Sequence, residues 1–365
     1  MLDGAARIKP LIQEVAAQGM PAIGISDHGN NHGAFDFYKT AKSAGVKPII
    51  GIEAYLTPGT ARQDRSRVKW GSGGDIDGDV SGGGAYTHMT MFAENTPGMY
   101  NLFRMSSKAW LDGYYFKPRM DRELLNTYGK GIIATTGCVS GEVQTRLRLG
   151  QYEEARKAAA EFQDIFGKEN FFAEIMDHGL DIERRTMSDL LRLAKDLDMP
   201  LLATNDLHYT HAGDADAHEA LLCVQSGSTL MDPNRFKFDA QEFYLKSAKQ
   251  MRELFADYPE ACDNTVDIAM NTKNETGGTI ITTDPPETAY SNEYVQQALD
   301  EEAAALHIAP WELHLQLLAS SRLSGNGAAL PFSLRFSPIS IPPGQRLELR
   351  GRVSQAGILT LRLPA

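Results

Sequence analysis

The segment "PAIGISDHGNNHG", residues 21–33, determines how the fold is interpreted. Its first half is apolar and β-prone, which is typical of a buried strand. Its second half places Asp27, His28 and His32 in a turn rich in Gly and Asn. Such a turn needs residues that tolerate unusual backbone angles, but it does not need histidine. Two alternatives follow for Asp27 and His28: they cap the next helix, or they bind a metal ion.

The same order of elements recurs along the chain. A β-prone run ends in or carries a residue that can bind a metal or a proton, and a helical pattern follows. The further runs are "VKPIIGIEAYL", "AYTHMTMFAEN", "GIIATTGCVSG", "NFFAEIMDHG" and "MPLLATNDLHY". Helical spacing of apolar residues follows in "YEEARKAAAEFQDIF" and "ERRTMSDLLRLAKDLD". The pattern predicts an α/β fold of parallel strands with crossover helices. At least six such units favour a barrel over an open sheet, with functional groups at the C-terminal ends of the strands.

Composition limits the class of protein. The 365 residues carry a net charge of -11, with 42% hydrophobic and 23% charged residues, so we expect two globular domains. The acidic balance argues against polyanion binding over the whole surface, but it leaves room for a local basic groove or a carboxylate site that holds metal ions. Three widely spaced cysteines predict reduced thiols and a cytoplasmic protein. No apolar run is long enough to predict a membrane span.

The character of the sequence changes along its length. Residues 1–275 hold the strand and helix repeats, and residues 60–84 within them predict a long Gly-rich loop. Residues 276–310 predict a linker and one helix. Residues 311–365 alternate apolar and polar residues, which predicts a small, mainly β segment of antiparallel strands.

Several polar residues at the predicted strand ends form a candidate metal site. They are His28, Glu53, His88, Cys138, Asp206 and His208. Imidazole and carboxylate groups are the usual ligands of zinc, manganese and iron. Two such ions about 4 Å apart can stabilise the attacking and leaving oxygens of a phosphoryl transfer.

Each of these residues also has a structural interpretation. Glu53 could form a buried ion pair, His88 could be a hydrogen-bonded core histidine, and Cys138 could be a small buried hydrophobic residue. Asp206 and His208 are two positions apart, which predicts that both point to one face of a strand. The remaining histidines are His32, His178, His211 and His218, which we interpret as surface, capping or ligand-supporting groups.

Four segments extend the interpretation to a known family. They are residues 1–56, "GCVSGEVQTRLRLGQYEEA", "LLATNDLHY" and "HEALLCVQSGSTLMDPNRFKFDAQEFYLKSAKQMRELF". This sequence closely resembles the polymerase and histidinol phosphatase (PHP) domain of bacterial DNA polymerase III α subunits, from Met1 to about Met270. The resemblance implies a distorted (βα)7-type barrel. In some members the domain binds up to three divalent ions, zinc or manganese, and acts as a 3′→5′ exonuclease; in others it is structural.

The resemblance also implies site residues and partners. The family's metal ligands fall on Asp3, His28, Glu53, His88, Cys138, Asp206 and His208. Glu53 is implied to bridge two ions, and Asp206 and His208 to hold one side, so these three are the expected catalytic residues. The implied partners are a DNA 3′ end and the other subunits of the polymerase III holoenzyme.

Two departures from the family set further expectations. The family has a strand with a His-x-His pair just before the Met-Leu-Asp-Gly at which this chain starts. We therefore expect the first strand to be missing, a slot between unpaired strand edges, and fewer than three ions. The resemblance stops before the palm domain, so we expect no polymerisation by this chain alone. The alternatives are a non-catalytic structural fragment with an incomplete site, or a phosphatase for a small phosphomonoester.

Overall fold

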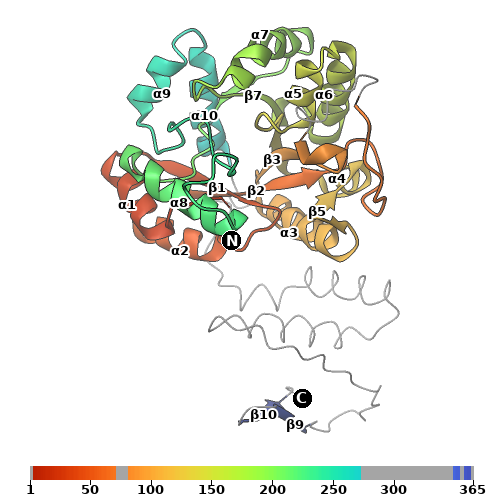
Figure 1. The fold of residues 1–365 in the computed structure, drawn as a ribbon, viewed down its shortest axis with the longest axis vertical. Helices are drawn as coiled ribbons and strands as arrows, with labels where there is room; N and C mark the ends of the chain where they lie inside the picture. The colour runs from red at the N-terminus through yellow and green to blue at the C-terminus, as the bar shows by residue number, and fades with distance from the viewer. Residues whose placement is uncertain (1–2, 71–80, 273–347, 354–356, 363–365) are drawn as a thin grey trace. The chain divides into compact units, whose positions relative to one another are not determined.

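The computed structural model describes residues 3–70, 81–272, 348–353 and 357–362 (Figure 1). The chain divides into two compact units, Met1–Thr283 and Asp284–Ala365. The boundary of the barrel predicted at residue 275 remains a prediction.

The first unit is built on a curled, half-barrel sheet of eight strands (Figure 1). Its strands are β1 (Ala22–His28), β2 (Lys47–Leu56), β3 (Thr87–Ala93), β4 (Tyr114–Tyr115), β5 (Lys117–Met120), β6 (Ile132–Thr135), β7 (Phe171–Ile175) and β8 (Leu201–Ala203). The order is β4-β5-β2-β3-β6-β7-β8, and β1 pairs with β2. The long strand β2 is the hub, because it pairs with β1, β3 and β5.

Helices surround this sheet, which confirms the predicted mixed α/β fold (Figure 1). They are α1 (Ile8–Ala17), α2 (Ala34–Ser43), α3 (Thr96–Leu111), α4 (Arg122–Tyr128), α5 (Glu142–Arg148), α6 (Tyr152–Phe166), α7 (Asp181–Asp196), α8 (Ala215–Ser226), α9 (Ala248–Leu254) and α10 (Pro259–Asn271). The two helices predicted from apolar spacing match α6 and α7. Both bury small or apolar residues such as Ala159 and Leu193 against the strands.

The prediction that every strand runs parallel was wrong for β3. This strand is antiparallel to both β2 and β6. The described chain between β2 and β3 contains only the short 3₁₀ turn Ser81–Gly84 and no α-helix, so β3 has no helical crossover to return it to a parallel direction. His88 lies at the start of this reversed strand, which places it at the same end of the sheet as the final residue of β1.

Within the described residues, the strands β1, β4 and β8 each pair with a single neighbour. There, β1 pairs only with β2, and β8 pairs only with β7. An apolar cavity of about 360 Å³ lies between them, lined by Ile23 from β1, Leu202 from β8 and Ile268 from α10. The side chains of β1 and β8 that line this cavity are therefore apolar where a further strand would pack.

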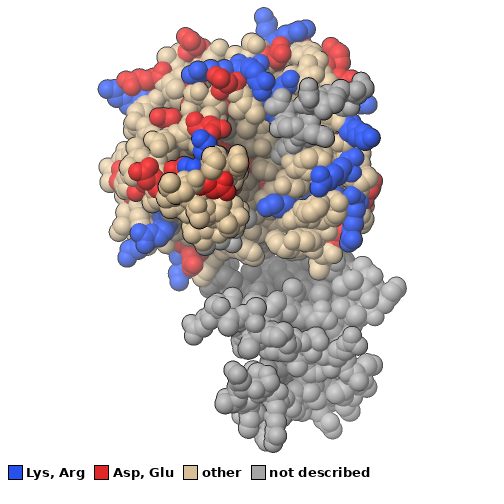
Figure 2. All heavy atoms as spheres, viewed as in Figure 1, with Lys and Arg blue, Asp and Glu red and all other residues tan. Residues whose placement is uncertain are grey.

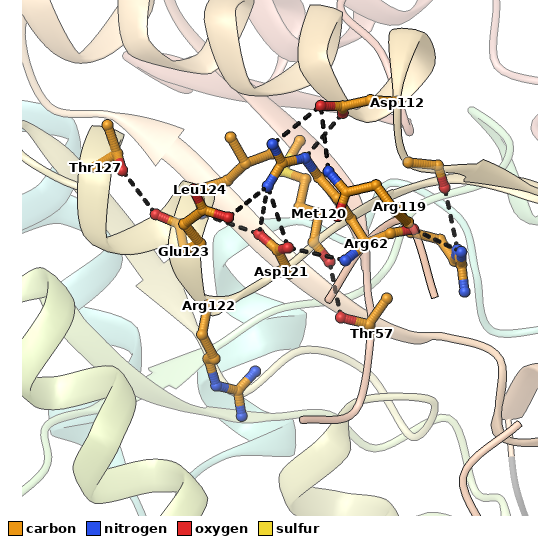
Figure 3. Close-up of polar contacts among 12 residues, drawn as sticks. Thr57, Arg62, Asp112, Arg119, Met120, Asp121, Arg122, Glu123, Leu124 and Thr127 are labelled. Atoms are coloured by element: carbon orange, nitrogen blue, oxygen red, sulfur yellow. Dashed lines mark hydrogen bonds and ion pairs between the residues drawn. The ribbon is translucent and has the colours of Figure 1, made fainter. Parts of the chain in front are cut away.

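A buried arginine connects the segment after β2 to two helices (Figure 3). The Arg62 guanidinium donates to Asp112 at 2.8 Å, to Asp121 at 3.2 Å and to Glu123 at 3.1 Å. Asp121 also accepts a bond from the Leu124 backbone and so caps α4. Hydrogen bonds to Asp112 are the first cause of the raised pKa of Arg62. The cluster fixes residues 57–70 beside the end of α3 and the start of α4.

The second unit contains one described hairpin, in which β9 (Glu348–Val353) pairs antiparallel with β10 (Gly357–Arg362). It confirms two of the alternating runs predicted near the C-terminus. The helix predicted within residues 276–310 and the other alternating runs lie outside the described residues. No helix in the described part of the chain is long and apolar enough to cross a membrane.

Replacing Arg62 by Met should lower the free energy of unfolding by about 3 kcal/mol, because the carboxylate of Asp121 is 3% exposed and would be left buried without its cation. Urea denaturation followed by circular dichroism would measure the change. Arg65→Met is the matched control, since Arg65 is exposed on the same segment and its loss should change the free energy by less than about 0.5 kcal/mol. Equal losses in both variants would contradict the role of the cluster.

Replacing Gly29 by Ala should lower the free energy of unfolding by about 2–4 kcal/mol. Gly29 has a φ of 67°, and an added Cβ would lie 2.8 Å from Pro118 Cγ and 2.9 Å from Tyr55 Cε2. Gly45 is the control, because its φ is 75° and an added Cβ would meet nothing within 4 Å. Gly45→Ala should cost only the backbone strain, about 1 kcal/mol. Similar urea midpoints for the two variants would show that the contacts around Gly29 do not matter.

Candidate metal centre

The seven predicted metal ligands converge at one end of the sheet, although they come from segments far apart in the sequence. His28 ends β1, Glu53 lies in β2 and His88 lies at the start of β3. Cys138 follows β6, and Asp3 lies before α1. Asp206 and His208 follow β8.

Glu53 is the centre of the first group. The β1–β2 register places His28 directly beside Glu53. His28 Nδ1 lies 3.4 Å from Glu53 Oε2, and His88 Nδ1 lies 2.7 Å from Glu53 Oε1. The Cys138 thiol donates to the same Oε1 at 3.7 Å. The possible ligand atoms of His28, Glu53 and His88 all lie within 4.8 Å of one another.

A second group shares His28 with the first. Asp3 Oδ1 lies 3.3 Å from His28 Nε2. One ligand atom each from Asp3, His28 and His208 lie within 4.8 Å of one another. His208 Nδ1 lies 3.9 Å from Asp206 Oδ1, which brings Asp206 beside this group. The structure therefore places two overlapping donor sets around one histidine.

The prediction that Asp206 and His208 share one face of a strand was wrong. Strand β8 ends at Ala203, and Asp206 has a φ of 41°, which is left-handed backbone. The two side chains lie close together because a constrained loop orients them. The His208 amide donates to the Phe243 carbonyl at 2.8 Å, which holds the loop at its far side.

The charges at the site depend on one another. Burial disfavours a charged His28, but the carboxylates of Glu53 and Asp3 outweigh burial and raise its pKa to about 9. Burial would raise the pKa of Glu53, but His28 and His88 outweigh it and lower the pKa to about 2. Burial and the charge of Glu53 raise the pKa of the Cys138 thiol. The carboxylates are thus held ionised by nearby positive charge, which a metal ion would also supply.

The residues present fit a divalent metal ion. Imidazole nitrogens, carboxylate oxygens and a thiol are the donor types that zinc and manganese bind. His28 Nδ1 is buried and makes no hydrogen bond, although it lies near the Glu53 carboxylate. A buried nitrogen in this state is suited to a ligand role, because an unmade polar contact is otherwise costly. A bound divalent ion would supply positive charge to a phosphate oxygen and make a nearby water more acidic.

The sequence left two alternatives for Asp27 and His28, helix capping and metal binding, and the structure gives each residue a different surrounding. Asp27 Oδ2 accepts a bond from the Gly33 amide at 2.8 Å, at the start of α2. This carboxylate therefore fixes the turn before the helix. His28, the next residue, points into the cluster with Glu53 and Asp3.

Two of the histidines interpreted from the sequence as surface, capping or ligand-supporting groups hold the segments that carry candidate ligands. His178 is buried; its Nδ1 donates to Glu183 at 2.5 Å and its Nε2 to the Asn205 carbonyl at 2.9 Å. The Asn205 carbonyl directly precedes Asp206, so this pair fixes the loop. His218 Nε2 donates to the Asp3 carbonyl at 2.6 Å. His32 and His211, by contrast, are exposed.

Glu174 is a buried carboxylate that the sequence analysis did not select. It accepts hydrogen bonds from Thr135 Oγ1 at 2.5 Å and Thr204 Oγ1 at 2.6 Å. Burial is the first cause that raises its pKa to about 7. Its signal in the sequence was the same as that of Glu53, a carboxylate inside an apolar run.

Comparison with known proteins identifies the family of this chain. Residues 1–178 match the PHP domain family. DNA polymerase III subunit alpha of Saccharopolyspora erythraea is 57% identical over 277 residues, which are 74% of this chain and 23% of that protein. The Mycobacterium tuberculosis protein of the same name is 56% identical over 271 residues, with the same shares. The chain thus spans about a quarter of the length of these relatives.

Among solved structures, a candidate metal-dependent phosphoesterase from Bifidobacterium adolescentis matches 56% of this chain and 84% of its own. Its identity is 12% and its TM-score is 0.29, too low to support a statement about this chain. The family assignment depends instead on the match of residues 1–178 and on the identity to the polymerase subunits. This chain therefore carries a PHP domain of the kind found in bacterial DNA polymerase III α subunits.

Proposed function

We propose that the first unit is a metal-dependent phosphoesterase that removes nucleotides from DNA 3′ ends, as a 3′→5′ exonuclease. The observation that supports this proposal is the convergence of two overlapping donor groups on His28. Several cations held close together would neutralise a phosphodiester that an acidic protein would otherwise repel.

Each residue would have a distinct task. Glu53 would bridge two ions, because its two oxygens face His88 and His28 separately. Asp206 and His208 would hold one side of the site. His178 and Glu183 would keep the loop before Asp206 in place, so that a substrate phosphate meets the same geometry at each turnover.

A non-catalytic role as a structural PHP unit is the second candidate. It is favoured by the open edges of β1 and β8 within the described residues. His28 and the Asp206 loop adjoin those edges, so an incomplete metal site is expected there. In a longer polymerase subunit, such a unit would contribute packing to the holoenzyme in the cytoplasm. Metal binding and cleavage assays separate the two candidates.

Asp206→Asn should reduce manganese-dependent release of mononucleotides from a 5′-labelled single strand by more than about a hundredfold, because it removes a proposed ligand rather than a group that only orients one. Gel electrophoresis of the products would measure this. The matched control is Asp216→Asn, which changes an exposed carboxylate on α8 and should leave the rate unchanged. Nuclease activity that survives Asp206→Asn intact would overturn the proposed role of this residue.

Adding manganese to the chelator-treated protein should raise its melting temperature, because an ion that binds only the folded state stabilises it, by about 2.7 kcal/mol at one hundred times the Kd. The shift should vanish in His28→Ala, which removes the residue shared by both donor groups, and persist in His32→Ala, which changes an exposed histidine of the same turn. Differential scanning calorimetry would provide both values. No shift in the unaltered chain would favour the structural candidate.

A further inference from the structure

A group of aromatic and basic side chains, all exposed except the half-buried Lys117, lies beside the metal centre. We call it the aromatic–basic strip; it consists of Arg67, Trp110, Tyr114, Phe116 and Lys117. Three large aromatic residues of the strip are exposed, at 46% for Trp110, 52% for Tyr114 and 57% for Phe116. Figure 2 shows Lys and Arg side chains gathered on the side of the molecule where Figure 1 places α3 and β5. Exposed rings among cations are unusual on a surface with no ligand to bind.

Direct contacts connect the strip to the candidate ligands. The Tyr55 ring stacks on His28 with centroids 5.7 Å apart and planes at 15°. Lys117 Nζ lies 5.3 Å from the centroid of the same Tyr55 ring. On a second path, the Trp110 indole donates to the carbonyl of Gly29, the residue after His28, at 3.0 Å. The strip therefore begins at the metal centre.

Within the described part of the chain, the cations of the strip contact aromatic rings rather than carboxylates. Arg67 lies over the Phe116 ring, with its guanidinium carbon 5.4 Å from the centroid. No ion pair to a carboxylate is found for Arg67 or Lys117 among the described residues. The neighbouring acids Asp112 and Glu123 are both bound by Arg62. In a chain with a net charge of -11, this is a local site for negative charge.

The backbone holds one ring outward at a cost. Phe116 has a φ of 61°, a left-handed conformation that is unfavourable for a bulky residue, and its side chain is more than half exposed. Burial in the core therefore cannot explain the conformation. The cause is the tight hairpin: Phe116 alone joins β4 to β5, in which Tyr115 pairs with Lys117, and such turns use left-handed backbone. Trp110 and Tyr114 stack on one another with centroids 5.4 Å apart, which gives a second ring surface.

We infer that the aromatic–basic strip binds single-stranded nucleic acid and guides its end to the metal centre. Unpaired bases would stack on Trp110, Tyr114 and Phe116, while Lys117 and Arg67 would contact the phosphates between them. Proteins that bind single strands without sequence preference combine these two features. The guiding of the strand end rests on the proposed function, because the strip leads to a site that would cleave a phosphodiester.

The test measures binding without cleavage. The full chain would be titrated into fluorescein-labelled (dT)12 and, separately, (U)12, with a chelator present to prevent hydrolysis, and fluorescence anisotropy would report the Kd. Titrations at several salt concentrations would count the phosphate contacts, since each contributes about 0.7 to the logarithmic salt slope. A (dT)12·(dA)12 duplex would test whether unpaired bases are needed.

Three variants remove parts of the strip. Tyr114→Ala and Phe116→Asn should each weaken binding about tenfold, because each removes one stacking surface. Asn tolerates the left-handed backbone of position 116, so this variant should remain folded. Lys117→Gln should weaken binding and lower the salt slope by about 0.7. The matched controls on α2 are Phe35→Ala, which removes an exposed ring, and Lys39→Gln, which removes a cation 5.2 Å from the centroid of that ring. Both variants should bind like the unaltered chain.

The outcomes distinguish this inference from the proposed function. Binding of (dT)12 or (U)12 that is weakened by the strip variants and not by the controls supports the inference, whether or not the chain cleaves DNA when manganese is added. Hydrolysis of bis-p-nitrophenyl phosphate without oligonucleotide binding would leave the metal-dependent phosphoesterase chemistry of the proposed function standing and overturn the inference. Equal binding of the duplex, or equal effects of variants and controls, would also overturn it.

Discussion

The buried carboxylate of Glu53 sets the constraint on which the first unit depends. It is 8% exposed, and an ionised carboxylate at such a position is unfavourable unless opposite charge lies beside it. Strand β2 meets this need because its neighbours carry His28 and His88 into contact with both carboxylate oxygens. The same strand pairs with β1, β3 and β5, so the register that places the histidines also holds the sheet together.

Loops supply the other candidate ligands, and a buried polar network keeps these loops in place. Asp206 has left-handed backbone, and the residue before it is bound through its carbonyl by His178 and through its side chain by Lys246. A ligand on such a loop is positioned nearly as firmly as one on a strand, because its neighbours cannot move without leaving polar groups unpaired. The rigidity of the site thus comes from residues that would not bind metal.

The distribution of charge would allow an acidic chain to accept the proposed anionic substrate. At the metal centre, carboxylates attract cations, which would in turn attract phosphate. Near the aromatic–basic strip in the sequence, Asp112 forms an ion pair with Arg62, and so does Glu123. The Arg62 cluster therefore neutralises these carboxylates with a cation of its own.

The sequence by itself indicated the α/β class, the helices α6 and α7 and six of the seven candidate ligands, because apolar periodicity and residue chemistry are local properties. Asp3 was added only by the resemblance to a known family. The sequence also indicated the open slot, through the same resemblance. Only the tertiary structure decided that β3 is antiparallel, that Asp206 and His208 lie on a loop, and which two of the four histidines interpreted as surface, capping or ligand-supporting groups, His178 and His218, support the site. These depend on hydrogen bonds between segments far apart in the sequence, such as His178 to Asn205 and His218 to Asp3, which no local pattern encodes.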